Sequence, residues 1–166
     1  MVVLALLAAG TATAQLRAPV RVSLEHGVAS VRPGMRTPEV AERWAVSLRP
    51  SYEVSPNCGP ADIRGVPGVA GYVVFMPRDR FGAVFLSKGA ITGRGIRIGS
   101  TLAELKRAYR RLRREPNRFD PQGAYYFVRR RLAPHWEFRF DVDASKRVRR
   151  IVFGTRAAAR LDEACA

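Results

Sequence analysis

The chain has 166 residues and carries 29 lysine and arginine side chains against 14 aspartates and glutamates, a formal net charge of +15 at neutral pH. This length permits one compact unit of ordinary size or two small units that share a core. No apolar stretch approaches the length of a membrane-spanning helix, so we expect no membrane span in the mature protein.

Residues 1–14 have the pattern of a secretory signal peptide. A short apolar run, Val2 to Ala9, is followed by Ala12-Thr13-Ala14, which places small residues at both key positions of a cleavage site. The run is too short to cross a membrane, and a buried N-terminal strand is the alternative interpretation. We therefore expect a protein that is secreted or periplasmic.

The first half of the chain predicts one helix among several strands. Alternating apolar residues over 19–25 indicate a half-buried strand. Thr37 is placed to cap a helix that has Pro38 at its first position, and Pro50 ends this helix. After a loop-rich stretch over 51–70, we expect strands at 71–76 and 81–87, joined by a turn at 77–79.

The second half repeats this plan. Thr101 and Glu104 have the spacing of a capping box, in which each side chain satisfies a backbone N–H at the start of a helix. The apolar face of this helix includes Tyr109 and Leu112, and Pro116 lies beyond its end. Strands are expected at 125–130, 136–142 and 147–153, followed by a final short helix at 155–164.

A short pattern occurs twice, 65 residues apart and without a net insertion. Each copy joins a glycine turn to a capped helix and continues into strands. The constant register indicates duplication of one supersecondary unit. We therefore predict an α+β fold of two tandem helix-plus-antiparallel-sheet modules, residues 15–90 and 91–166. The matching positions are Gly34 and Gly99, Glu39 and Glu104, Val40 and Leu105, Trp44 and Tyr109, Phe75 and Phe140, and Gly89 and Gly154.

This helix start, followed by an antiparallel hairpin that ends near a glycine, resembles the β-lactamase inhibitory protein fold and the small outer-membrane assembly lipoproteins of the SmpA/OmlA type. The resemblance covers most of residues 27–154. It implies two modules that form a concave sheet surface, with β-lactamase inhibition as one special case of protein binding. The inhibitory proteins have a disulfide within each module, whereas each module here has one cysteine. No inhibitory loop is present in this sequence.

Cys58 and Cys165 are the two cysteines of the chain. In an exported protein, a single disulfide is the default interpretation of such a pair. The bridge would close a loop of roughly 100 residues and tie the first module to the end of the second. Free reactive thiols are the alternative, but neither a nearby histidine nor a CxxC spacing supports it.

The sequence offers no convincing catalytic or metal-binding constellation. His26 and His135 are each isolated from cysteine at metal-ligand spacing. Asp141 and Asp143 share a strand face but lack the ligand ladder of a calcium loop. We expect no enzymatic activity, no cofactor and no metal. An unrecognised enzyme would need a cleft in which His135 converges with Asp141 or Asp143.

The excess of positive charge lies in residues 106–150, with fifteen basic against five acidic side chains. Aromatic residues interleave with the arginines, a mixture that would suit nucleic acid, but we do not expect nucleic acid for an exported protein. We expect the arginines to form a solvated face that attracts anionic envelope polymers. The candidate anion-binding residues are Arg107, Arg110, Arg111 and Arg114, on one face of the expected helix, and Arg129, Arg130, Arg131, Arg147, Arg149 and Arg150.

Our leading hypothesis is a non-catalytic secreted bacterial binding protein that contacts another exported or envelope protein. The alternative is a polyelectrolyte or anionic-envelope binder that uses the arginine-rich surface, and strong weakening of binding by salt would favour it. Aromatic residues dominate the energetics of protein interfaces. The expected protein-binding anchors are Tyr72, Tyr126, Trp136 and Phe138.

Overall fold

The computed structural model describes residues 16–53, 55–130, 133–162 and 165. The predicted signal peptide lies outside these residues. None of the described helices has the length and apolar character needed to cross a membrane. The elements are β1 Val20–Ser23, β2 Gly27–Val28, α1 Thr37–Trp44, β3 Gly59–Asp62, β4 Ala70–Met76, η1 Pro77–Asp79, β5 Arg80–Lys88, β6 Ala90–Thr92, α2 Leu102–Ala108, β7 Arg113–Pro116, β8 Ala124–Arg130, β9 Ala133–Val142, β10 Val148–Thr155 and η2 Ala158–Arg160.

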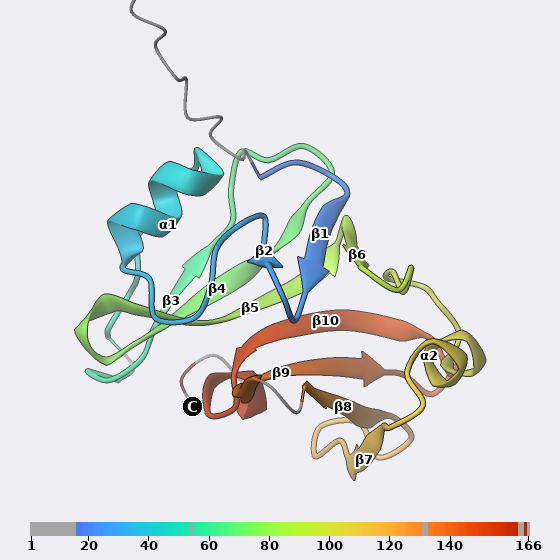
Figure 1. The fold of residues 1–166 in the computed structure, drawn as a ribbon. Coiled ribbons are helices and arrows are strands. Elements are labelled where there is room, and N and C mark those ends of the chain that lie inside the picture. Colours follow the sequence, from blue (N-terminus) through green and yellow to red (C-terminus); the bar gives the residue numbers. More distant parts are fainter. Residues whose placement is uncertain (1–15, 54, 131–132, 163–164, 166) are drawn as a thin grey trace, which may run out of the picture.

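Seven strands form one large sheet in the order β3-β4-β5-β10-β9-β8-β7, and every neighbouring pair is antiparallel. A small sheet of order β2-β1-β6 contains an antiparallel and a parallel pair. In Figure 1 the small sheet and α1 lie on the same side of the large sheet, and α2 lies at one end of β10. The predicted strands are confirmed with small boundary changes. The short strands β2, β3, β6 and β7 were not predicted.

The predicted architecture of two tandem helix-plus-sheet modules is wrong. Strands make up 42% and helices 15% of the part of the chain that the structure describes, and the large sheet is continuous across both halves of the sequence. The junction is β5, whose Leu86 and Val84 pair with Ile151 and Phe153 of β10. Residues 81–86 of β5 are all buried. A strand buried on both faces belongs in the middle of a sheet, with a neighbour on each edge.

Helix α1 covers the first half of the large sheet through Val40 and Trp44, both buried. The indole Nε1 of Trp44 donates to the Val28 carbonyl oxygen at 3.0 Å, so this buried polar group is satisfied. The prediction that Thr37 caps the helix is wrong. Arg36 occupies the cap position, and its backbone N–H donates to Glu39 Oε2 at 2.6 Å.

The capping box of α2 is confirmed. The Glu104 N–H donates to Thr101 Oγ1 at 3.2 Å, and the Thr101 N–H donates to Glu104 Oε2 at 2.7 Å. The helix ends at Ala108, earlier than predicted, because Tyr109 has extended backbone angles. Arg113 to Pro116 then joins the sheet as edge strand β7. Pairing with β8 outweighs the helical preference of this segment.

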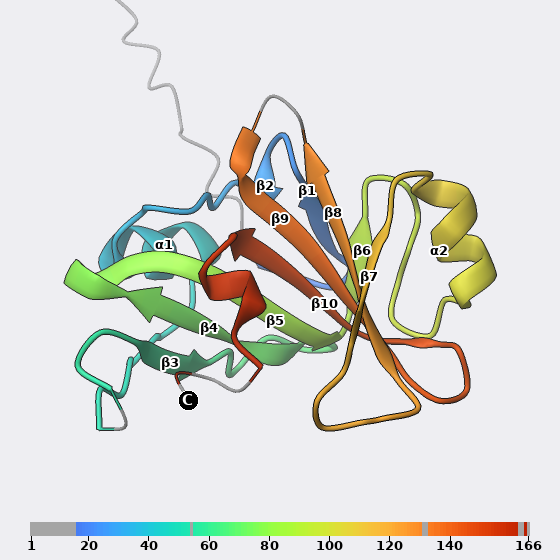
Figure 2. The same ribbon diagram turned by 90° about the horizontal axis from the view of Figure 1, so that it is seen from below.

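The C-terminal segment covers the second face of the large sheet. Figure 2 shows η2 lying across β5 and β10 on the side opposite α1. Ala158 and Ala159 are buried there against Phe85 and Val152. The predicted final helix over 155–164 is wrong, since within the described residues this segment contains only the short 3-10 turn η2.

The predicted disulfide is confirmed. Cys58 and Cys165 are bonded, with their Cα atoms 5.3 Å apart and a sequence separation of 107 residues. The bridge connects the loop before β3 to the end of the C-terminal segment. It therefore attaches the C-terminal segment to the β3 edge of the large sheet.

Candidate functional site

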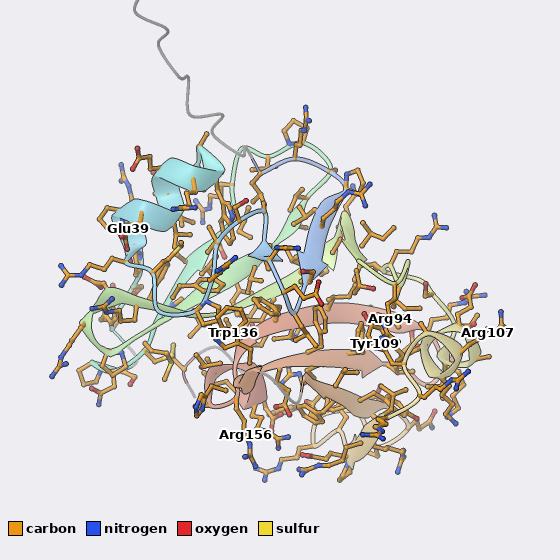
Figure 3. The ribbon with its side chains drawn as sticks, viewed as in Figure 1. Glu39, Arg94, Arg107, Tyr109, Trp136 and Arg156 are labelled. Carbon is orange, nitrogen blue, oxygen red and sulfur yellow. A yellow bond between two sulfur atoms is a disulfide. The ribbon has the colours of Figure 1, made fainter. Side chains whose placement is uncertain are left out.

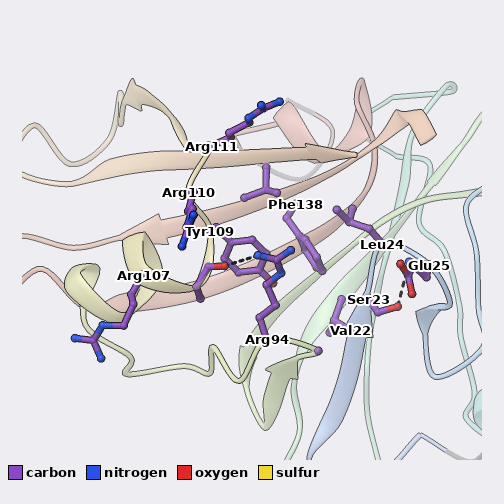
Figure 4. A pocket seen from close by; sticks show the side chains of 13 residues that line it. Val22, Ser23, Leu24, Glu25, Arg94, Arg107, Tyr109, Arg110, Arg111 and Phe138 are labelled. Carbon is purple, nitrogen blue, oxygen red and sulfur yellow. Dashed lines mark hydrogen bonds between the residues drawn. The ribbon is translucent and has the colours of Figure 1, made fainter. Parts of the chain in front are cut away.

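A pocket of about 580 Å³ opens where the end of α2 faces β1, β8 and β9 (Figure 4). This volume lies within the range of small-molecule sites. Its inner wall is apolar and consists of core side chains, because Val22, Val128 and Phe138 are all buried. Three separate strands contribute these side chains, so the packing of the core holds the wall in place.

Tyr109 forms the side of the pocket next to α2. Its backbone N–H donates to the Leu105 carbonyl oxygen at 2.9 Å, and its ring lies 5.4 Å from Phe140 and 6.2 Å from Phe138. The pKa of Tyr109 is raised above its usual value by burial, which outweighs a hydrogen bond with Thr92. The phenol is therefore neutral at physiological pH and adds no negative charge to the pocket.

Arg94 links the loop before α2 to the pocket. Its guanidinium lies 5.2 Å from the centre of the Tyr109 ring, and Nη1 donates to the Ala108 carbonyl oxygen at 2.6 Å. Cations are favoured at the C-terminus of a helix, where carbonyl oxygens lack partners. Figure 3 shows Arg94, Arg107 and Tyr109 gathered beside α2, with Trp136 at the other end of β9.

Arg107, Arg110 and Arg111 also line the pocket. The predicted helical stripe that joins them to Arg114 is wrong, because α2 ends at Ala108. Arg107 lies on α2, and the turn of the chain after Ala108 places Arg110 and Arg111 at the same pocket. Within the described part of the chain, Arg110 and Arg111 have no hydrogen-bonding or ion-pair partner. Arg114 does not line the pocket, because it lies in edge strand β7.

The opposite wall of the pocket carries a negative charge. Glu25 follows β1, its side chain is 58% exposed, and Oε2 lies 4.0 Å from His26 Nε2. The pocket is thus polarised, with arginines at the α2 side and one carboxylate at the β1 side.

The remaining predicted anion-binding arginines do not line this pocket. Arg147 Nη1 donates to the Gly99 carbonyl oxygen at 2.9 Å. Arg149 lies 3.7 Å from Asp143, and Arg150 lies 3.6 Å from Asp141. These three side chains are engaged within the protein. Arg129 and Arg130 belong to β8, and Arg131 lies outside the described residues.

The four predicted aromatic anchors do not form one surface. Tyr126 is 6% exposed and Phe138 is 2% exposed, so both belong to the core and are removed as surface anchors. Tyr72 stacks on Phe85 at 4.6 Å on the second face of the sheet. Trp136 is partly buried and packs against the main core, on the face of the large sheet that α1 covers.

The sequence analysis missed a charged network buried on the second face. Glu137 and Arg139 are fully buried, and the Arg139 guanidinium lies 4.5 Å from the centre of the Tyr125 ring. Its Nε donates to Asp141 Oδ1 at 2.8 Å, and Nη1 donates to the Leu161 carbonyl oxygen at 2.7 Å. The strict alternation of charged and aromatic residues over 137–141 was the available signal.

A second pocket, of about 490 Å³, tests the enzyme hypothesis. Asp141 and Asp143 both line it, together with Tyr125. Burial raises the pKa of Tyr125 to about 12, and its hydroxyl donates to Asn117 Oδ1 at 2.9 Å. His135 lies six residues before Asp141 on the same strand, a separation of about 20 Å. The predicted convergence of this histidine with the aspartates is therefore not found.

No group of three or more metal-ligating side chains is assembled among the described residues. The residues that line the first pocket could instead hold an anion. Guanidinium groups bind carboxylates and phosphates through paired hydrogen bonds.

The comparisons with known proteins extend only to the fold. The chain matches no protein-family model, and no curated protein matches it. It is similar to the crystal structure of a cysteine-rich secretory protein from Staphylococcus aureus subsp. aureus Mu50, with a TM-score of 0.51 and 11% identity. The match covers 86% of this chain and 51% of that protein, so the chain spans about half the length of its neighbour.

Proposed function

We propose that this chain is a non-catalytic extracytoplasmic binding protein that contacts an anionic exported or envelope component. The contact surface, here named the α2 surface, surrounds helix α2 and the pocket beside it. The observation that carries the proposal is the concentration of exposed basic side chains there, with Glu104 beside them and Glu25 across the pocket. The α2 surface consists of Arg94, Arg97, Lys106, Arg107, Arg110, Arg111, Lys146 and Arg147.

Two observations support an extracytoplasmic location. Disulfides persist in oxidising compartments and are rare in the cytosol, and Cys58 is bonded to Cys165. The structural neighbour is itself described as a secretory protein. Both agree with the signal-peptide pattern of the sequence.

The alternative, binding of an exported protein through aromatic anchors, has less support. Tyr126 and Phe138 are buried beneath the elements that cover the first face. Contacts made by them would require the core to open. A protein partner therefore fits the proposal best if acidic side chains meet the α2 surface.

Retention on immobilised poly-glutamate and on dextran sulfate tests the proposal. The test variant carries Arg107→Gln, Arg110→Gln and Arg111→Gln. The control carries Arg17→Gln, Arg32→Gln and Arg49→Gln, three exposed arginines of the first half of the chain. Both variants lose the same formal charge, so a difference between them reports the location of binding.

We expect the wild-type protein to be retained at low salt and released as the salt concentration rises, because exposed charges are screened. The α2-surface variant should elute at clearly lower salt than the control. Equal elution of the two variants would show that retention depends on net charge alone, and it would contradict the proposed surface. Absence of retention on both polyanions would contradict the proposed function.

A further inference from the structure

We propose that the α2 surface binds an extended, flexible polyanion, a linear chain with a negative group on successive units, which contacts helix α2 on two sides. This inference rests on the proposed function, because it names the class of anionic component that the same surface binds. The argument uses the exposure of α2, the positions of the basic side chains around it, and the grooves that these side chains line.

Helix α2 is accessible over most of its circumference. Of its seven residues, Leu105 is the buried one. Figure 2 shows the helix at the periphery of the molecule, beside the large sheet and not across either of its faces. A rigid, flat partner would reach one side of such a helix, whereas a flexible chain can follow its curved surface.

Basic side chains lie on two faces of α2, and each face borders a groove. Glu104 and Arg107, three residues apart, share one face and line a groove of about 300 Å³, here named the Arg97 groove after the arginine of the preceding loop that also lines it. Lys106 lies on another face and lines a groove of about 420 Å³ together with Lys146, here named the Lys106 groove. Positive charge is therefore present on both sides of the helix.

The grooves follow one another around the helix. The Arg97 groove shares Arg94 and Arg107 with the pocket of about 580 Å³. On its other side, Ser100 lines the Arg97 groove and the next residue, Thr101, lines the Lys106 groove. Arg147 also lines the Lys106 groove, and its guanidinium is held by a backbone carbonyl oxygen just before α2. A basic side chain thus lies at each step of this path.

The basic groups are too dispersed to bind one compact anion together. Figure 4 shows the side chains of Arg107, Arg110 and Arg111 pointing in different directions. Within the described residues, Arg110 and Arg111 have no hydrogen-bonding or ion-pair partner, and the same holds for both lysines of the Lys106 groove. Each of these groups can bind a separate negative group. A single exposed ion pair contributes little, so appreciable affinity requires several negative groups joined in one ligand.

The acidic side chains leave this surface strongly positive. Eight basic and two acidic side chains, Glu25 and Glu104, line the pocket and the two grooves. The Glu104 carboxylate accepts the Thr101 backbone N–H at 2.7 Å, and this hydrogen bond is the main cause that lowers its pKa. Glu104 is therefore ionised and offsets one positive charge, while the excess around α2 remains.

Binding of polyphosphate chains of different length to the full chain tests the inference. Tripolyphosphate carries its charge in one compact cluster, whereas long-chain polyphosphate carries the same groups along a flexible chain. Affinities are measured by titration calorimetry and compared per phosphate, so the number of groups does not by itself favour the longer chain. Serum albumin, a folded protein of net negative charge, represents an acidic protein partner.

Three double variants, which remove the same formal charge, locate the contacts. The first removes charge from the side of the pocket and the Arg97 groove, and the second removes charge from the Lys106 groove. The third is a control that changes two exposed arginines of the first half of the chain. In this order, the variants are Arg107→Gln/Arg110→Gln, Lys106→Gln/Lys146→Gln and Arg32→Gln/Arg49→Gln.

We expect long-chain polyphosphate to bind at least about tenfold more tightly per phosphate than tripolyphosphate does. The logarithm of its affinity should fall with the logarithm of the salt concentration with a slope of about −4 to −6, because each contact releases about 0.7 counterion. Each of the two α2 variants should weaken binding by about fivefold or more and reduce the size of this slope by about 1 to 1.5. The control should bind as the wild type does.

Three outcomes would overturn the inference. Equal affinity per phosphate for tripolyphosphate and the long chain would show that no extended contact forms. Wild-type binding by Lys106→Gln/Lys146→Gln would show that the chain contacts one side of α2 only. Tighter binding of serum albumin than of long-chain polyphosphate would assign the surface to a folded acidic partner.

The two proposals fail in different ways. Any of these outcomes leaves the proposed function standing, provided that retention on poly-glutamate and dextran sulfate still depends on Arg107, Arg110 and Arg111. Absence of retention on both of these polyanions, together with absence of polyphosphate binding, would overturn both proposals.

Discussion

At the scale of single residues, the arginines of this protein fall into two groups with opposite roles. Arg139 is fully buried, contacts the Phe85 and Tyr125 rings and pairs with Asp141, so its charge is used to hold the protein together. Arg110, in contrast, is exposed and has no partner within the described residues. Net charge by itself does not separate these groups.

The first prediction concerns the buried pair. Arg139→Met should lower the free energy of unfolding by about 3–5 kcal/mol, because it leaves Asp141 and the Leu161 carbonyl oxygen without their buried partner. Arg149→Met is the control. Its side chain is 73% exposed and 3.7 Å from Asp143, so the loss should be about 1 kcal/mol or less. Urea denaturation measures both, and equal losses would contradict the structural role of Arg139.

At the scale of elements, two helix starts that look alike in sequence are built differently. Thr101 caps α2 through its hydroxyl oxygen, as its spacing from Glu104 predicts. Thr37 stands one residue inside α1, and its Oγ1 is buried without a hydrogen-bond partner in the described structure. At that helix start, the backbone N–H of Arg36 donates to the side chain of Glu39.

The second prediction compares the two threonines. Thr101→Ala should lower the free energy of unfolding by about 0.5–2 kcal/mol, the usual cost of losing a helix cap. Thr37→Ala removes a hydroxyl that has no partner, so its effect should stay within about 0.5 kcal/mol. Chemical denaturation of the two single variants provides the measurement. A larger loss for Thr37→Ala would show that Thr37 is the true cap of α1.

At the scale of the whole molecule, the C-terminal segment fastens the second face of the sheet. Arg160 Nε donates to Glu137 Oε2 at 2.9 Å, and its Nη1 donates to Glu115 Oε1 at 3.1 Å. Its guanidinium lies 4.3 Å from the centre of the Phe127 ring. The disulfide then ties the end of the segment to the loop before β3. Because the C-terminal segment covers this face, charged side chains of the strands beneath it are buried.

The third prediction concerns this fastening. Both cysteines of the native protein should be unreactive to thiol reagents until a reductant is added. Cys58→Ser/Cys165→Ser should lower the free energy of unfolding by about 4–5 kcal/mol, because the bridge no longer restricts the unfolded chain. Urea denaturation of the variant and of the reduced wild type should give the same midpoint. Thiol labelling of the untreated protein would contradict the bridge.

The sequence by itself determined what depends on neighbours along the chain. Strand positions followed from alternating apolar residues, and the start of α2 followed from the spacing of Thr101 and Glu104. Compartment chemistry predicted the partner of Cys58 correctly. The arginine excess also directed attention to residues 106–150, which include three arginines of the pocket.

Tertiary structure decided which elements meet. The repeat predicted two separate modules, but pairing between β5 and β10 joins both halves in one sheet. Because β7 pairs with the edge of the sheet, α2 ends at Ala108. The chain turns after this residue, which brings Arg110 and Arg111 to the pocket. Arg94 lines the same pocket from another loop. Periodicity reports which face of a strand is apolar, whereas strand partners and the cover over each face are non-local choices. For that reason the buried Arg139 and the pocket beside α2 became visible only in the folded chain.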